Sequence, residues 1–176
     1  MMRLWPRHVR SRMTLWYVLV LGFLLLAYAG GASLYLFYSL RPAKSALDTA
    51  RIAKIVGHEG EQNGAVYKIT VGRADLDVKE MGATINARMG LNTWAAFVGT
   101  DEDAAVAGDV AMLESEVTPT LKALRGHGLE VVAIHHHMTN SRPLVIFLHY
   151  WGRGPADKLA TGFKAALDEL GKGNKQ

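Results

Sequence analysis

Three histidines in the C-terminal half of the chain have the spacing best suited to chemistry. His135 and His137 lie in the run LEVVAIHHHM, residues 129–138, and His149 lies in PLVIFLHYW, residues 143–151. Both runs predict β-strands, in which side chains two residues apart point to the same face. His135 and His137 therefore form a pair on one face, and His136 points to the other.

The short TNSR connection between the two runs predicts a hairpin. A register whose paired residue numbers sum to 282 places His135 opposite Phe147 and His149 opposite Ala133. All three histidines then share a face, and His149 is diagonal to His135 at about 7 to 8 Å. A shift of one residue would move His149 to the opposite face, so the shared face depends on this register.

Three imidazoles on one face are a candidate metal site. Imidazole ligates Zn, Cu, Ni and Fe, and three histidines with an open position can activate a metal-bound water. The nearest carboxylates in the sequence are Asp109, Glu114 and Glu116, and one of them could complete the site or act as a base. The alternative is that the histidines are hydrogen-bonded residues of a polar sheet face with no ligand.

The elements that would position these residues predict an α+β fold. Alternation predicts strands at 65–71, 93–100, 104–113, 129–138 and 143–151, with a short strand at 83–85 and turns at 58–64 and 101–103. Helices are predicted at 43–56, at 116–125 with Ser115 as its cap, and after Pro155. This order predicts a two-layer sandwich of a mostly antiparallel sheet with helices on one face.

The first part of the chain predicts a membrane anchor. Residues 14–40 contain no charge, and a spanning helix needs only about 20 residues. Four arginines precede this segment, so the positive-inside rule places the N-terminus in the cytoplasm and the domain outside a bacterial cytoplasmic membrane. A signal peptide cleaved after Ala29 is the competing interpretation, and it exports the domain as well.

Composition limits the other function classes. The net charge is +4 and the pI about 9.4, but residues 43–176 carry 15 basic and 16 acidic groups, which is a net charge of −1. A domain so close to neutral lacks the basic surface that phosphate-backbone binding requires, so we exclude nucleic acid as a partner. The chain has no cysteine, which excludes disulfides, thiolate ligands and a cysteine nucleophile.

Two resemblances to known proteins extend this interpretation. Residues 10–41 resemble the first transmembrane helix of sensor histidine kinases, but nothing after Pro42 resembles a phospho-acceptor helix or an ATP-binding region. The segments GAVYKITVGRADLDV, GLNTWAAF, AGDVAMLESEVTPTLKALRGHGLEVVAIHHHM and FLHYWGRG resemble the LppY/LpqO family of bacterial exported proteins over residues 46–170. That family has no established activity, so the resemblance implies a location rather than a reaction.

The LppY/LpqO resemblance also implies which residues matter. The family pattern of His-Asn-His followed by a strand with a further His is matched by His135, His137 and His149, while His136 occupies the position of the Asn. A family Glu-Val pair is matched at Glu116, which makes Glu116 the carboxylate that the resemblance favours. The expected metal ligands are therefore His135, His137, His149 and Glu116.

These observations predict five segments and leave three functions open. The segments are a cytoplasmic basic segment at 1–13, a transmembrane helix at 14–40, a linker with a short helix at 41–63, the α+β domain at 64–170 and a disordered tail at 171–176. The first function is binding of a divalent metal (Zn, Cu, Ni or Fe) or a small ligand through the histidines. The second is a metal-dependent enzyme resembling a hydrolase, and the third is a non-catalytic, membrane-tethered interaction or sensor module.

Overall fold

The computed structural model describes residues 7–39 and 47–172, with side chains for 16–36 and 47–172. The chain divides into two compact units, Met1–Pro42 and Ala43–Gln176. The predicted disordered tail lies outside the described residues from 173 onward, as does the start of the predicted linker up to residue 46. The two units are described separately.

The first unit contains one long helix, α1 (Arg7–Ser39). Its segment Trp16–Leu36 is 21 residues long, has a mean hydropathy of 1.9 and buries none of its side chains inside the structure. A helix of this length and composition can cross a membrane. A signal sequence near an N-terminus has the same properties, so the helix alone does not determine the topology.

The second unit is an α+β domain, as the sequence predicted. Among the described residues, its chain order is α2 (Thr49–Val56), β1 (Gly60–Asn63), β2 (Val66–Gly72), β3 (Val78–Glu80), β4 (Ala83–Ile85), η1 (Ala87–Met89), β5 (Asn92–Gly99), β6 (Ala104–Met112), α3 (Glu114–Gly126), β7 (Glu130–His136), β8 (Ile146–Gly154) and α4 (Ala156–Leu167). The strand predicted at 83–85 is present as β4.

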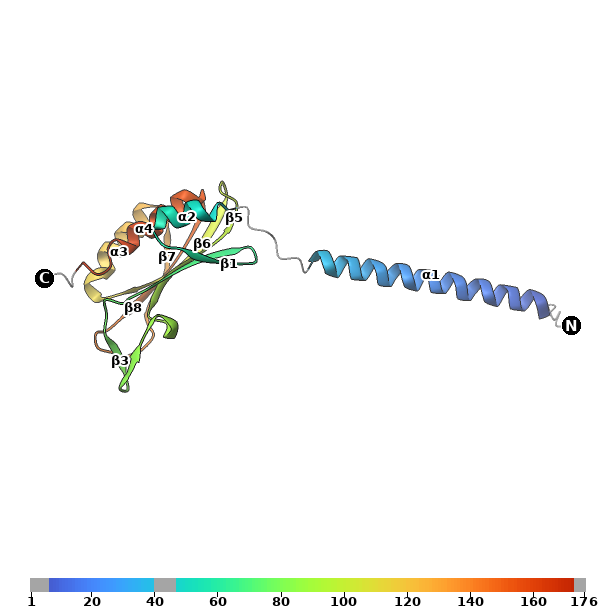
Figure 1. The fold of residues 1–176 in the computed structure, drawn as a ribbon, viewed down its shortest axis with the longest axis horizontal. Coiled ribbons are helices and arrows are strands. Elements are labelled where there is room, and N and C mark those ends of the chain that lie inside the picture. Colours follow the sequence, from blue (N-terminus) through green and yellow to red (C-terminus); the bar gives the residue numbers. More distant parts are fainter. Residues whose placement is uncertain (1–6, 40–46, 173–176) are drawn as a thin grey trace. The chain divides into compact units, whose positions relative to one another are not determined.

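The described strands form two antiparallel sheets. The larger has six strands in the order β1-β2-β5-β6-β8-β7, and the smaller is the β3-β4 hairpin. Helices α2, α3 and α4 cover one face of the larger sheet, and the β3-β4 hairpin projects from the side away from them (Figure 1). We call the face without helices the open face.

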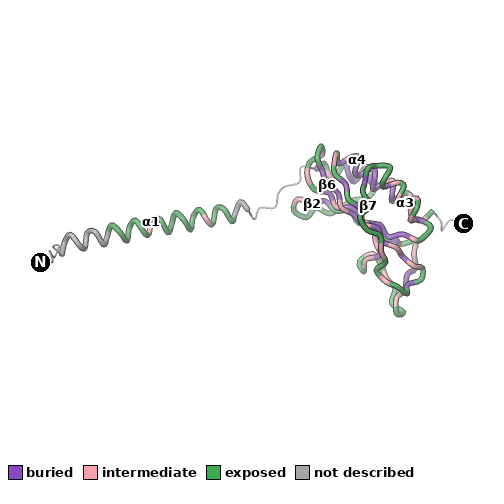
Figure 2. The backbone as a smooth tube through the Cα atoms, turned by 180° about the vertical axis from the view of Figure 1, so that it is seen from behind, coloured by how far each residue is buried: buried purple, intermediate pink, exposed green. Residues whose placement is uncertain are grey.

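The main core lies between the helices and the sheet. Alternate strand residues face the helices, for example Ile69 in β2 and Phe97 in β5, and they pack with Leu159 and Phe163 of α4. Figure 2 shows the buried residues concentrated between these two layers. Because strand side chains alternate, the residues between these core positions point to the open face.

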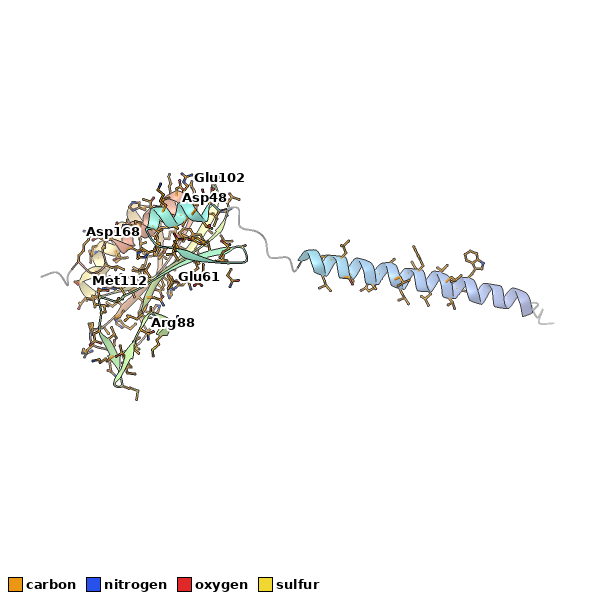
Figure 3. All side chains as sticks on the ribbon, viewed as in Figure 1. Asp48, Glu61, Arg88, Glu102, Met112 and Asp168 are labelled. Atoms are coloured by element: carbon orange, nitrogen blue, oxygen red, sulfur yellow. The ribbon has the colours of Figure 1, made fainter. Side chains whose placement is uncertain are left out.

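Helix α2 is tied to the sheet at its N-terminus. The Asp48 carboxylate accepts a hydrogen bond from the Arg51 amide at 3.0 Å, which caps the helix. The Asp48 amide donates to Asp101 Oδ1 at 2.8 Å in the β5-β6 turn. Asp48 and Glu102 accordingly lie at the same end of the domain (Figure 3).

The turn predicted at residues 58–64 is partly wrong, because Gly60–Asn63 form the edge strand β1. The residues of β1 are polar and do not alternate with apolar ones. The strand lies at the edge of the sheet and pairs only with β2. Gly60 makes the pairing close: its amide donates to the Tyr67 hydroxyl at 2.9 Å, and a Cβ would lie 2.8 Å from the Lys68 carbonyl oxygen.

Candidate functional site

Strands β7 and β8 pair in the register on which the shared histidine face depends, with paired residue numbers that sum to 282 at the histidines. Ala133 lies opposite His149 and His135 lies opposite Phe147. The register shifts between Val131 and Ala133, which is a β-bulge, and this irregularity lies beyond the histidines. The sequence left this register open, and the observed pairing places His135 and His149 on the same face of the sheet.

The side chains of the three histidines are neighbours on the open face. The Nε2 atoms of His135 and His149 are 2.8 Å apart, and their ring centroids are 4.8 Å apart. The His137 ring lies 4.9 Å from that of His135 and stacks on Phe147 at 3.6 Å. A nitrogen pair at 2.8 Å is a hydrogen bond, so one Nε2 donates and the other accepts.

The arrangement is not a finished coordination sphere. Within residues 16–36 and 47–172, no three His, Asp or Glu side chains stand as a group that could hold a metal ion. Two nitrogens, those of His135 and His149, already meet at one point. His137 contributes a third imidazole beside them, but it is engaged in stacking with Phe147.

Asp109 brings a carboxylate to the same place. It lies in β6 directly opposite His149 of β8, because β6 and β8 are adjacent strands. Its Oδ1 is 3.8 Å from His149 Nδ1. The residue is only 5% exposed, and Oδ1 has no hydrogen-bond partner among the described residues. A buried carboxylate oxygen without a donor is costly, so this atom needs an explanation.

Burial is the largest influence on the pKa values of Asp109 and His137. It raises the pKa of the Asp109 carboxyl, although the charges of His149, His137 and His135 act in the opposite direction. Burial also lowers the pKa of His137, against the opposing effect of Asp109. The shift of His137 favours the neutral imidazole, which is the form that binds a metal ion.

Glu116, the carboxylate favoured by the family resemblance, is occupied elsewhere. Its Oε2 accepts hydrogen bonds from Arg73 Nη1 at 2.7 Å and from the Leu113 amide at 2.8 Å. Its Oε1 accepts from Arg73 Nη2 at 3.0 Å and from the Gly171 amide at 2.6 Å. These four bonds account for the carboxylate, and none of its described contacts is with a histidine.

The same contacts change the predicted start of helix α3. Ser115 was expected to cap a helix over 116–125, but the helix begins at Glu114, and Leu113 is its N-cap without a side-chain cap bond. The Glu116 side chain instead reaches back to the Leu113 amide. Gly171, the first residue of the predicted tail, is held by the same carboxylate.

A small second core supports the site from one side. It consists of Val78, Leu91, Ala111, Val145 and Phe147, with the partly buried Leu76 and Ile85 packed against it. Phe147 connects this core to the histidines through its stacking with His137. The β3-β4 region therefore covers one end of the open face and leaves the histidines at its edge.

The other side of the site is bordered by Trp94, which lies opposite Asp109 on β5. Lys68 Nζ sits 4.3 Å from the centre of the Trp94 ring, in a cation–π contact. A pocket of about 320 Å³ lies elsewhere and is lined by His58, Arg73 and Lys164 among others. None of the three site histidines lines that pocket.

The sequence named Asp109 only as one of three nearby carboxylates. A signal was present, because Asp109 is a charged residue within the otherwise uncharged strand AAVAGDVAML. What could not be read was its partner, since β6 and β8 are adjacent in space although α3 and β7 lie between them in the chain.

Comparison with known proteins gives one match. A family model described as Domain of Unknown Function (DUF1259) matches residues 50–169, which include α2 and every strand and helix of the second unit through α4. No curated protein and no solved structure matches the chain. The match contains the three histidines, Asp109 and Glu116, and it assigns no activity to them.

Proposed function

The chain belongs to the DUF1259 family of domains of unknown function, and we propose that its domain binds a divalent transition-metal ion through His135, His149 and His137. The single observation that supports this most is the meeting of His135 Nε2 and His149 Nε2 at 2.8 Å. An ion between them would replace the hydrogen bond that joins them.

The change of geometry needed for ion binding is small. Two nitrogens that ligate one tetrahedral Zn²⁺ at about 2.0 to 2.1 Å lie about 3.3 Å apart. His135 and His149 need to separate by only about 0.5 Å to reach that distance. His137, 4.9 Å from His135 between ring centroids, becomes a third ligand by leaving its stack on Phe147.

The ligand atoms limit the class of ion. Imidazole nitrogen favours Zn²⁺, Cu²⁺, Ni²⁺ and Fe²⁺ over Mg²⁺ and Ca²⁺, which prefer an all-oxygen environment. A cation at this site would favour the ionised form of the buried Asp109 beside His149, which would then supply negative charge close to the ion. Glu116 is left out of the proposed ligand set because Arg73 and two main-chain amides already hold its oxygens.

The test is the metal content of the full chain, purified in detergent without a histidine tag and incubated with Zn²⁺, Cu²⁺, Ni²⁺ or Fe²⁺. We expect about one ion per chain, measured by elemental analysis after removal of free metal. His135→Ala and His149→Ala should lose the ion. The matched control is His136→Ala, whose side chain leaves the strand on the opposite face. A wild-type chain that stays free of all four metals contradicts the proposal.

A metal-dependent enzyme is a second candidate, favoured by the position of the histidines on the face without helices. His137 is exposed there, so an ion at this site would keep a position open to solvent and substrate. An activated water at that position would make hydrolysis the expected reaction. Loading the chain with Zn²⁺ and assaying ester and phosphoester substrates tests this, and activity that survives His149→Ala would contradict it.

We further infer that the domain is extracytoplasmic and of the LppY/LpqO type. The arginines before the apolar helix support an N-terminus in the cytoplasm, with the helix kept as an anchor. Protease added to intact bacterial spheroplasts should then digest the domain. Protection of the domain in intact spheroplasts, with digestion after lysis, would place it in the cytoplasm instead.

A further inference from the structure

We propose that Asp109 holds His149 in the tautomer that directs its Nε2 lone pair at an ion shared with His135, and that the main-chain carbonyl of His136 would accept a hydrogen bond from His135 Nδ1 when that ion binds. This inference rests on the proposed metal site and names what orients it. Asp109 is in this view a positioning residue rather than a ligand. Metal-binding histidines usually donate their second ring N–H to a carboxylate or a carbonyl, and this partner fixes the tautomer.

His149 turns one ring nitrogen toward His135 and the other toward Asp109. Its Nε2 faces His135 Nε2 at 2.8 Å, and its Nδ1 faces Asp109 Oδ1 at 3.8 Å. With its proton on Nδ1, the His149 ring can donate a hydrogen bond to Asp109 Oδ1, and its Nε2 keeps a lone pair. Asp109 Oδ1 is buried and has no other hydrogen-bond partner in the described part of the chain, so it is free for this role.

His135 has a main-chain carbonyl near its second ring nitrogen. Its Nδ1 lies 3.5 Å from the carbonyl oxygen of His136, which is a long hydrogen-bond distance. The 2.8 Å contact between the two Nε2 atoms needs one N–H, and His135 is the ring that can supply it while His149 keeps its proton on Nδ1 toward Asp109. An ion bound between the two Nε2 atoms would require the His135 proton on Nδ1, whose N–H would then donate a hydrogen bond to the His136 carbonyl oxygen. Neither imidazole changes its charge.

A single movement of the His149 ring would make room for an ion beside His135 and bring His149 closer to Asp109. Strand β8, which carries His149, lies between β7 with His135 and β6 with Asp109. A shift of the His149 ring from β7 toward β6 lengthens the Nε2–Nε2 distance, as an ion requires. The same shift shortens the 3.8 Å gap to Asp109, which is about 1 Å longer than a charge-assisted hydrogen bond. The site therefore tightens around the ion from both sides.

The experiment compares the full chain with Asp109→Ala, Asp109→Asn and His136→Ala, all purified in detergent without a tag. Long-range ¹H–¹⁵N NMR of histidine-labelled protein reports the tautomer of each ring without an ion. Zinc affinity is then measured by competition with a chromophoric chelator. The tautomer of His149 would not change if the role of Asp109 were purely structural. Asp109→Asn serves as a second variant in case Asp109→Ala folds poorly, because asparagine keeps the side-chain volume and an acceptor oxygen.

We expect His149 to carry its proton on Nδ1 in the wild type and to populate the Nε2–H form in Asp109→Ala. Zinc affinity should fall by about 10- to 100-fold in Asp109→Ala, with Asp109→Asn between that value and wild type. His136→Ala should match the wild type, because it keeps the carbonyl.

Two results would overturn separate parts of the argument. The role of Asp109 would be overturned if Asp109→Ala and Asp109→Asn both kept the wild-type tautomer and bound zinc within about threefold of wild type. The metal site would stand in that case. A wild-type chain that binds no zinc would overturn the metal site, and the tautomer comparison would still decide whether Asp109 orients His149.

Discussion

Replacing Glu116 by alanine should strongly destabilise the domain and leave its metal affinity unchanged. Glu116 is 3% exposed and accepts four hydrogen bonds, two of them from the Arg73 guanidinium. Its loss leaves the Arg73 side chain, which is 3% exposed, without its more buried partner. Removing one member of a buried ion pair costs about 3 to 5 kcal/mol in the free energy of unfolding.

The contacts of Arg73 refine this magnitude. Arg73 keeps a two-point contact with Asp75, from Nε at 2.8 Å and Nη2 at 2.7 Å, and it still donates to the Ala111 carbonyl at 2.7 Å. These contacts place the ion-pair cost near the lower end of the range, about 3 kcal/mol. The unpaired Leu113 amide at the start of α3 adds about 1 kcal/mol. A total of about 4 kcal/mol corresponds to a fall in Tm of roughly 10 to 20 °C.

The assay is thermal unfolding of the full chain in detergent, followed by circular dichroism of the sheet signal. Glu114→Ala is the matched control, because Glu114 is an exposed residue in the same helical turn and should change stability by less than about 0.5 kcal/mol. The double variant Arg73→Met with Glu116→Leu should lose less than Glu116→Ala, since no unpaired charge remains. A loss below about 1 kcal/mol in Glu116→Ala refutes the structural role, and a folded variant without zinc affinity restores Glu116 as a ligand.

Two further predictions concern the open face and the strand that carries Asp109. Because burial raises the pKa of Asp109 in the folded chain, the folded state holds this proton more tightly than the unfolded state does, and stability should fall as pH rises from the ordinary carboxyl pKa through the raised one. Asp109→Asn should lack this fall in stability. Urea unfolding of metal-free wild type and Asp109→Asn between about pH 4 and pH 8 measures the free energy of unfolding of each. Parallel pH profiles of the two proteins would contradict the raised pKa. Gly108→Ala should destabilise the domain by about 1 to 3 kcal/mol, because its Cβ would lie 2.1 Å from the buried Tyr150 ring. Gly126→Ala, with nothing within 4 Å, is the control in the same Tm measurement and should be neutral or slightly stabilising; equal effects at the two glycines would contradict the packing argument.

Local patterns predicted most of the fold, because the main strands alternate and the helices carry one apolar face. The hairpin of β7 and β8 was predicted, but its register was left open, because a shift of one residue would satisfy the same two strand patterns. The edge strand β1 was missed, because its residues GEQN are mostly exposed and do not alternate between apolar and polar types. The start of α3 was also missed, since a bond from Glu116 to the Leu113 amide replaces the side-chain cap expected from Ser115.

The site was predictable only in part, for a different physical reason. His135 and His149 lie in strands that are consecutive in the chain, and the antiparallel pairing of β7 with β8 brings them together. Asp109 reaches His149 only through the pairing of β6 with β8, which depends on how the whole sheet assembles around α3. A single sequence contains no local signal for that pairing, and the choice between Asp109 and Glu116 required the structure.

The two buried carboxylates of this domain differ in a way that separates structure from function. Glu116 and Asp109 are almost equally hidden from solvent, at 3% and 5% exposure. Every oxygen of Glu116 accepts hydrogen bonds, so its burial is compensated. Asp109 Oδ1 has no such bond within the described residues, and its carboxyl pKa is raised, so the fold bears an uncompensated cost there. A cation held by the adjacent histidines would compensate that cost, because it would strengthen the contact between His149 and Asp109. The unsatisfied carboxylate is therefore where ligand binding would gain most.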